Sequence, residues 1–169
     1  MARIAEAINP QLKPGLAQPV LYQVKAMQFR TSTASETLNT QALPPRRVLL
    51  LEDDDAFQEI MRDFLESHSY EVVAVKNGVE GVREIMAGDF EVIICDMLMP
   101  NLPGDMFYLA VERMRPHLCD RFIFITGLRD NCKVTDFIRK VNGTMLHKPF
   151  HVDDLLEIIG FVQIKTGML

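Results

Sequence analysis

The fold of this chain is decided by the stretch Glu91-Val92-Ile93-Ile94-Cys95-Asp96. Its apolar, mostly β-branched run ends abruptly at a carboxylate, and a loop containing Pro100, Pro103 and Gly104 follows. Such a run is typical of a buried strand in a parallel sheet, which would deliver Asp96 to the carboxyl-terminal edge of that sheet. Open α/β sheets place their chemistry at this edge. A single Asp at a strand end also suits a simple turn, so other residues must decide its role.

A second apolar run, Val48-Leu49-Leu50-Leu51, ends in the acidic residues 52–55. If the two strands are neighbours in a parallel sheet, Glu52, Asp53 and Asp96 converge on one pocket. Crowded carboxylates raise one another's pKa unless a cation neutralises them. Hard oxygen ligands suit Mg²⁺, or Mn²⁺ in its place, and the absence of clustered His or Cys argues against zinc. The acidic residues therefore predict a divalent-metal site.

Two more apolar runs end in polar residues at the same predicted edge. The run Phe122-Ile123-Phe124-Ile125 ends in Thr126, and the run Met145-Leu146-His147 ends in Lys148. A hydroxyl and an ammonium are both able to contact the oxygens of a phosphoryl group attached to Asp96. Each residue alone is more often an ordinary strand-end residue. Together with the acids, they predict phosphoryl chemistry.

With these residues assembled, the sequence resembles the receiver domain of two-component response regulators, of the chemotaxis-regulator kind. The resemblance covers about residues 46–165, and its motif residues occur in the family's order and at its intervals. They are Glu52-Asp53, Asp96 followed by Met99-Pro100, Gly104, Thr126-Gly127 and Lys148-Pro149-Phe150. The resemblance implies a flavodoxin-like α/β fold, with a doubly wound, five-stranded parallel sheet and helices on both faces. Alternating strand and helix patterns from Arg46 onward predict the same architecture.

The resemblance also assigns roles to individual residues. It implies that Asp96 is the phosphoacceptor, and that Asp53 and Asp96 bind Mg²⁺ with Glu52 acting through the metal or through water. Leu98 lends its backbone carbonyl to the metal, while Thr126 and Lys148 contact the phosphoryl oxygens. The donor would be a histidine kinase or a phosphotransfer protein. Such a protein catalyses only its own aspartyl phosphorylation and dephosphorylation, and is not an enzyme acting on a free substrate.

Composition limits the other possibilities. The chain has 169 residues, of which 48% are apolar, and a net charge of −5, so one core of ordinary size is expected. The mild acidity gives no support for nucleic-acid binding, and no apolar stretch is long enough to span a membrane. The three cysteines, an odd number without metal spacing, are typical of reduced thiols in a cytoplasmic protein.

The pattern divides the chain in two. Residues 46–169 form the predicted receiver domain, and residues 1–45 form an N-terminal extension and linker, either flexible or docking on a partner. Three prolines before residue 20 prevent a long helix there. Residues 20–29 are largely apolar and fit either a strand or a short helix. Residues 31–45 are rich in Ser, Thr and Asn and end in Pro44-Pro45, which is typical of a flexible linker.

Helical periodicity gives a set of detailed expectations. Asp55 is expected to cap the first helix, with Gln58 in a capping box. Asn77-Gly78 should start the second helix, Asn142-Gly143 should end the fourth, and the last should run over 152–165. The Lys148-Pro149 bond is expected to be cis, as it usually is in the resembling family. The apolar side chains expected to face the core of the first three helices are Phe57, Ile60, Phe64 and Leu65, then Val79, Val82 and Met86, then Met106, Leu109 and Ala110.

The output surface is expected on the 131–165 face. The last helix has more apolar surface than one face needs, which suggests contact with a target protein, a second copy of the chain or the N-terminal extension, although plain core burial explains it equally well. The resemblance suggests an aromatic switch residue three positions before Lys148, but that position is Met145. A flexible Met there could still fill or vacate the same space.

Two alternative functions compete with a phosphoaccepting receiver. A degenerate receiver would act as a phosphorylation-independent protein-binding module, an idea motivated by Met145 and the extension. A phosphatase with an aspartyl nucleophile would need a second Asp two residues after the first, where Leu98 stands. Leu98 and Leu128, each two residues beyond a site residue, would exclude a hydrolytic water and predict slow loss of the phosphoryl group.

Overall fold

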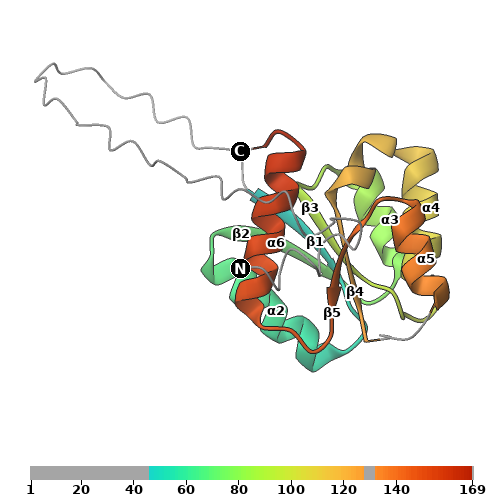
Figure 1. Ribbon diagram of the computed structural model, residues 1–169. Coiled ribbons are helices and arrows are strands. Elements are labelled where there is room, and N and C mark those ends of the chain that lie inside the picture. The colour runs from blue at the N-terminus through green and yellow to red at the C-terminus, as the bar shows by residue number, and fades with distance from the viewer. Residues whose placement is uncertain (1–45, 128–131, 169) are drawn as a thin grey trace, which may run out of the picture.

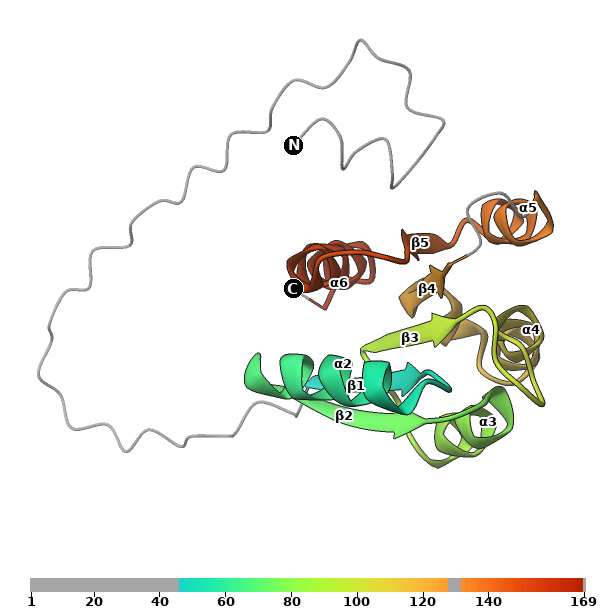
Figure 2. The ribbon, with the colours of Figure 1, turned by 90° about the horizontal axis from the view of Figure 1, so that it is seen from below.

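The computed structural model describes residues 46–127 and 132–168 (Figure 1). Within these residues the chain forms one five-stranded sheet in which every neighbouring pair is parallel. Figure 2 shows the strand order β2-β1-β3-β4-β5. The strands are β1 (Arg46–Leu51), β2 (Tyr70–Val75), β3 (Val92–Asp96), β4 (Phe122–Thr126) and β5 (Thr144–His147). The predicted doubly wound fold is confirmed.

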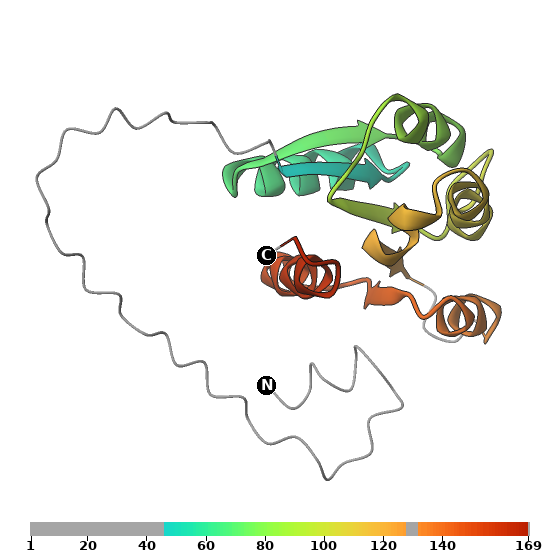
Figure 3. The same ribbon diagram turned by 90° about the horizontal axis from the view of Figure 1, so that it is seen from above.

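Helices cover both faces of this sheet, as Figures 2 and 3 show from opposite sides. The helices α2 (Asp55–Ser67) and α6 (Val152–Lys165) pack on one face. The helices α3 (Gly78–Ala87), α4 (Gly104–Met114) and α5 (Cys132–Lys140) pack on the other, and a short 3₁₀ helix, η1 (Pro116–Arg121), leads into β4. Because both faces are covered, all five residues of β3 and all five of β4 are buried. This burial explains why these strands are continuous apolar runs rather than alternating ones.

The predicted start of the first helix is wrong by one residue. Asp54 caps α2 and its carboxylate accepts a hydrogen bond from the Phe57 backbone N–H at 2.9 Å, whereas Asp55 is the first helical residue. Gln58 does not take part in a capping box. Its side chain is buried, and its Nε2 donates hydrogen bonds to the backbone oxygens of Glu52 and Val75. The run of consecutive acids made the cap position ambiguous, because Asp suits the N-cap and the first turn alike.

Four apolar side chains expected in the core face solvent instead. Ile60, Val79, Met86 and Met106 are all exposed. The buried faces of their helices are displaced around the axis, toward Met61 in α2, toward Phe107 and Val111 in α4, and toward two glycines in α3. A buried helix face that contains glycine has no apolar periodicity to detect. The other inward residues predicted for these helices are buried or half-buried.

Several finer predictions are confirmed. Asn77 caps α3, the chain turns at Asn142 after α5, and α6 has the predicted bounds. The Lys148-Pro149 bond is cis. Predictions that fall on residues 1–45 and on Leu128 lie outside the described residues. In the part of the chain that is described, we find no helix with the length and apolar character that a membrane span requires.

Gly81 allows α3 to pack closely against the core. A Cβ at this position would lie 2.6 Å from Cδ2 of Leu51 and 2.9 Å from Cε2 of Phe107, and both side chains are fully buried. In contrast, a Cβ at Gly160 in α6 would meet no atom within 4 Å. A side chain at Gly81 would therefore clash with the core, whereas a side chain at Gly160 would not.

We predict that Gly81→Ala destabilises the protein by roughly 1–2 kcal/mol, because overpacking outweighs the better helix propensity of Ala. Gly160→Ala is the matched control and should stabilise the protein by about 0.5–1 kcal/mol through propensity alone. Urea denaturation of both variants measures the difference. A Gly81→Ala variant as stable as the wild type would contradict the packing argument.

Candidate functional site

The predicted acidic residues converge at the carboxyl-terminal edge of the sheet. This edge lies at the bottom of Figure 1, where β5 ends and α2 and α6 begin. Glu52 and Asp53 follow β1, Asp96 ends β3, and β1 and β3 are adjacent strands. One carboxylate oxygen from each of the three residues lies within 4.8 Å of the others. Glu52 and Asp96 are buried, and Asp53 is exposed.

Lys148 joins this acidic group from the end of β5. Its Nζ lies 2.7 Å from Glu52 Oε2 and 2.6 Å from Asp96 Oδ2. The same ammonium lies 4.4 Å from the ring centroid of Phe57 on α2. An ammonium over an aromatic face is attracted by the negative charge of the ring face. Lys148 is thus held between two carboxylates and a ring.

The ionisation of the site reflects burial and mutual attraction. Burial raises the pKa of the Glu52 carboxyl above its usual range, and the hydrogen bond from Lys148 only partly opposes this effect. Burial alone would lower the pKa of Lys148, but its hydrogen bonds to Asp96 and Glu52 outweigh burial and raise that pKa. Lys148 is therefore protonated at neutral pH, whereas burial disfavours the charged form of Glu52.

The backbone around Asp96 fixes its side chain. The backbone N–H of Leu98 donates to Asp96 Oδ1 at 2.8 Å, and Lys148 donates to the other oxygen. Each of the two carboxylate oxygens therefore accepts a hydrogen bond, and together these bonds fix the side chain. Gly104 begins α4 so close to this point that a Cβ there would lie 2.6 Å from the backbone oxygen of Asp96. Any larger residue would push the start of α4 away from the end of β3.

Thr126 and Leu98 also lie at this edge. Thr126 ends β4 next to β3, is fully buried, and its backbone oxygen accepts a hydrogen bond from the Lys148 N–H at 2.9 Å. Leu98 follows Asp96 in the loop after β3, and its side chain is 52% exposed. All six predicted site residues therefore follow or end strands at one edge of the sheet, and Lys148 contacts two of the three acids, Glu52 and Asp96.

Two residues near the site were not predicted as part of it. Phe57 was expected only in the core, and Gln58 only in a helix cap. Gln58 in fact binds the end of β1 to the end of β2 through its two backbone contacts. The available signal was spacing, because Gln58, Met61 and Leu65 repeat at helical intervals and a polar residue in a buried stripe implies a buried partner.

The arrangement fits a hard divalent cation. Of the three grouped carboxylates only Glu52 and Asp96 contact the Lys148 ammonium, so negative charge remains in excess, and Asp53 is exposed. Oxygen-only donors with room for water are the ligands that Mg²⁺ or Mn²⁺ prefers. The donor set supports a metal site at Glu52, Asp53 and Asp96.

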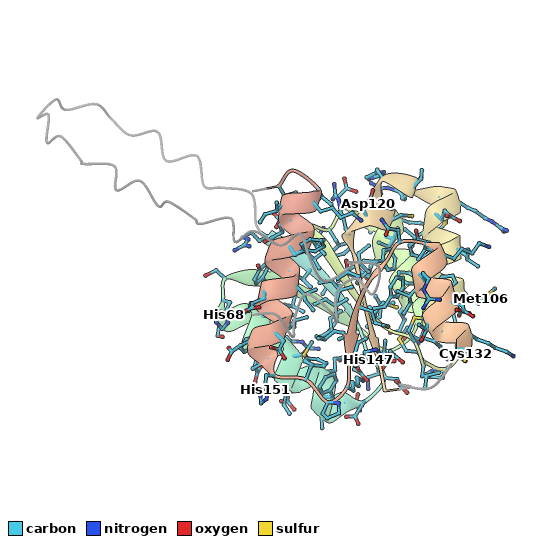
Figure 4. The ribbon with its side chains drawn as sticks, viewed as in Figure 1. His68, Met106, Asp120, Cys132, His147 and His151 are labelled. Atoms are coloured by element: carbon cyan, nitrogen blue, oxygen red, sulfur yellow. The ribbon has the colours of Figure 1, made fainter. Side chains whose placement is uncertain are left out.

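The histidines are distributed without a common site. Figure 4 places His147 and His151 near the lower edge of the molecule and His68 at the side, beside α2. The Nδ1 atom of His147 is buried without a hydrogen-bond partner. No described histidine belongs to the acidic group.

Met145, two residues before His147 in β5, is half-buried and packs against the core cluster under α3, α4 and α5.

Comparison with known proteins identifies the family of this chain. The family model for the response regulator receiver domain matches residues 48–160. The response regulator receiver protein CpdR of Brucella abortus is 28% identical over 114 residues, which are 68% of this chain and 93% of CpdR. The transcriptional regulatory protein CrdR of Helicobacter pylori is 28% identical over 110 residues, 65% of this chain but only 51% of CrdR.

A solved structure gives the same fold. The CheY-like receiver domain protein of Methanospirillum hungatei superposes with a TM-score of 0.68 at 24% identity, covering 74% of this chain and 98% of that protein. The matched region is thus nearly all of some relatives and about half of others.

We predict that Lys148→Met destabilises the metal-free protein by roughly 3 kcal/mol at pH 7.5, because two buried carboxylates lose their cation. The deficit should shrink toward pH 5, since Glu52, whose pKa is already raised, takes up a proton in the variant. In the wild type, the contribution of Lys148 is complete below its ordinary pKa of 10.5 and is lost as the pH rises through its raised folded value.

Urea denaturation in EDTA at both pH values measures the deficit. Arg139→Met is the control, because the Arg139–Asp136 ion pair is exposed and its loss should cost less than about 0.5 kcal/mol at either pH. A Lys148→Met deficit that does not change with pH would refute the charge argument.

Proposed function

Since the chain belongs to the response regulator receiver family of two-component signalling, we propose that it accepts a phosphoryl group on Asp96 in a Mg²⁺-dependent reaction. We propose further that residues 46–169 form the receiver domain and residues 1–45 an extension of it. The observation that supports this function best is the contact of Lys148 with both Glu52 and Asp96 at the strand edge. That contact unites three predicted site residues from separate strands.

The proposed reaction is an in-line displacement at phosphorus. A carboxylate oxygen of Asp96 attacks the phosphorus of a donor phosphohistidine, forming an O–P bond while the P–N bond to the donor breaks. The leaving imidazole takes up a proton. The product on this chain is an aspartyl phosphate. A small phosphodonor such as acetyl phosphate would react in the same way, with acetate leaving.

The chain's own groups position the reactants. The N–H of Leu98 and the ammonium of Lys148 already orient the two oxygens of Asp96. Lys148 and Thr126 would then hold the oxygens of the transferred group, so that catalysis is mainly positioning plus charge neutralisation. Glu52, Asp53, Asp96 and the Leu98 carbonyl would hold Mg²⁺, which supplies positive charge where negative oxygens gather. The protein modifies only itself and turns over no free substrate.

The partners follow from this chemistry. The donor is a histidine kinase or a phosphotransfer protein, and the signal passes to a protein target through the 131–165 face, formed by α5, β5 and α6. We place this exchange in the cytoplasm. Exposed apolar residues on α6 support a protein contact there.

Intact-mass measurement after incubation with acetyl phosphate and Mg²⁺ tests the proposal. The wild type should gain one phosphoryl group, and the gain should disappear with EDTA or in Asp96→Asn. Asp105→Asn, an acid in the first turn of α4, is the control and should still gain the group. An unmodified wild type that nevertheless binds a protein partner would favour a phosphorylation-independent binding module.

We also predict that the phosphoryl group is lost slowly. Leu98 lies two residues after Asp96, and its exposed side chain is apolar where a polar one could orient water. The double variant Leu98→Asn with Leu128→Glu should therefore lose the group several-fold faster, followed as the decay of phosphorylated mass after the donor is removed. Met106→Asn, another exposed apolar site, should keep the wild-type rate. Equal decay in the double variant would defeat the idea.

A further inference from the structure

The helix α6 has apolar side chains on its solvent side as well as on its core side. Leu155, Ile158, Ile159 and Val162 are buried against the sheet. On the outward side, Phe161 is 44% exposed and Ile164 is 58% exposed, while Leu156 and Gly160 are half-buried. Leu156, Gly160 and Ile164 are four residues apart, and Phe161 lies three before Ile164, so they share one side of the helix. We call these four residues the α6 strip.

Large apolar side chains that stand together on the solvent side of a helix are often covered by a partner. Within the described residues, Leu156 packs partly against the core, whereas Phe161 and Ile164 stay exposed and a Cβ at Gly160 would meet no atom within 4 Å. The strip therefore has two large exposed side chains, Phe161 and Ile164, beside Gly160, which has no side chain. Contiguous apolar surface of this kind indicates a binding site for another segment of protein.

The chain enters β1 beside the C-terminal half of α6. Arg46, the first described residue, donates from Nη2 to Gln163 Oε1 at 2.8 Å and to the Tyr70 hydroxyl at 2.6 Å. Gln163 directly precedes Ile164 and is buried. In Figure 1 the start of β1 lies behind the C-terminal half of α6. The first described residue is thus held at the C-terminal half of α6 through Gln163, the neighbour in sequence of Ile164.

The segment 20–29 has the composition to cover the strip. Its sequence, Val20-Leu21-Tyr22-Gln23-Val24-Lys25-Ala26-Met27-Gln28-Phe29, is mostly apolar. Residues 30–45 connect it to Arg46 and, fully extended, span up to about 55 Å. The helix α6 is only about 21 Å long at 1.5 Å per residue, so the linker reaches every point of the strip.

Charge favours the same pairing. The outward side of α6 has Asp153 and Glu157 exposed, and the one basic residue of the helix, Lys165, already pairs with Asp120. The segment contains Lys25 and is followed directly by Arg30, with no acid between residues 7 and 35. A basic apolar segment against an acidic apolar strip is complementary in both respects.

We infer that residues 20–29 of the same chain dock on the α6 strip. The docked segment covers Phe161 and Ile164 and occupies part of the 131–165 face. A target protein or a second copy that binds α6 must therefore first displace the segment. This inference does not depend on phosphorylation of Asp96.

The test uses the full chain with one fluorescent reporter. The chain contains no Trp, so Tyr22→Trp introduces a single one within the segment. We expect its emission to be shifted to the blue and protected from acrylamide quenching, in a protein that is monomeric by light scattering. Adding Ile164→Asp should shift the emission to that of solvent-exposed Trp. Because Ile164 is exposed, this change should leave the thermal unfolding of the receiver unaltered.

Met106→Asp is the matched control, since Met106 is 51% exposed on α4, and Figure 4 shows it across the molecule from α6. It should keep the blue-shifted emission. Solvent-exposed emission from the Tyr22→Trp chain would overturn the inference, as would a blue shift that survives Ile164→Asp. A blue shift that fades on dilution as a dimer dissociates would also overturn it, because the occupant would then belong to a second copy.

Discussion

Lys148 allows two carboxylates to remain buried at the edge of the sheet. Its Nζ contacts both Glu52 and Asp96 at 2.7 Å and 2.6 Å, and the side chains of these acids are only 3% and 8% exposed. Without this ammonium, two like charges would be buried close together, which is among the costliest arrangements in a protein. One ammonium does not balance three carboxylates, however. The remaining negative charge suits a hard divalent cation, which is the metal that the proposed reaction needs.

The topology of the sheet is what brings these groups together. Lys148 is 96 residues from Glu52 and 52 from Asp96 along the chain, yet all three follow strands that run in one direction. The order β2-β1-β3-β4-β5 reverses direction between β1 and β3, and the acids follow these two strands. Open α/β sheets bind ligands at such a switch point because the connecting loops diverge to opposite faces there. The contacts of Gln58, Phe57 and Gly104 hold the starts of α2 and α4 close to the acidic residues and Lys148.

Much of this arrangement could be predicted from the sequence, and what could not has identifiable physical reasons. Continuous apolar runs predicted β1, β3 and β4 because strands covered on both faces need no alternation, and the polar residues at the ends of these runs lie at one edge of the sheet. Helix faces were predicted less well. In α3 the buried residues are Gly78, Gly81 and Ile85, and because two of the three are glycines the apolar pattern pointed to Val79 and Met86, which are exposed. In α2 the buried polar side chain of Gln58 looked like a capping residue. Both errors concern residues whose role depends on close contact with another element, which periodicity along one helix does not report.

Among several neighbouring acids, Asp96 is the one that we propose forms the acyl phosphate. Borohydride reduces an aspartyl phosphate to homoserine, so reduction after treatment with acetyl phosphate and Mg²⁺, followed by tandem mass spectrometry, identifies the modified residue directly. The structure predicts homoserine at position 96 alone, since that carboxylate is oriented by both Leu98 and Lys148. Homoserine at position 53, or none at any acid despite an active phosphodonor, would contradict the account.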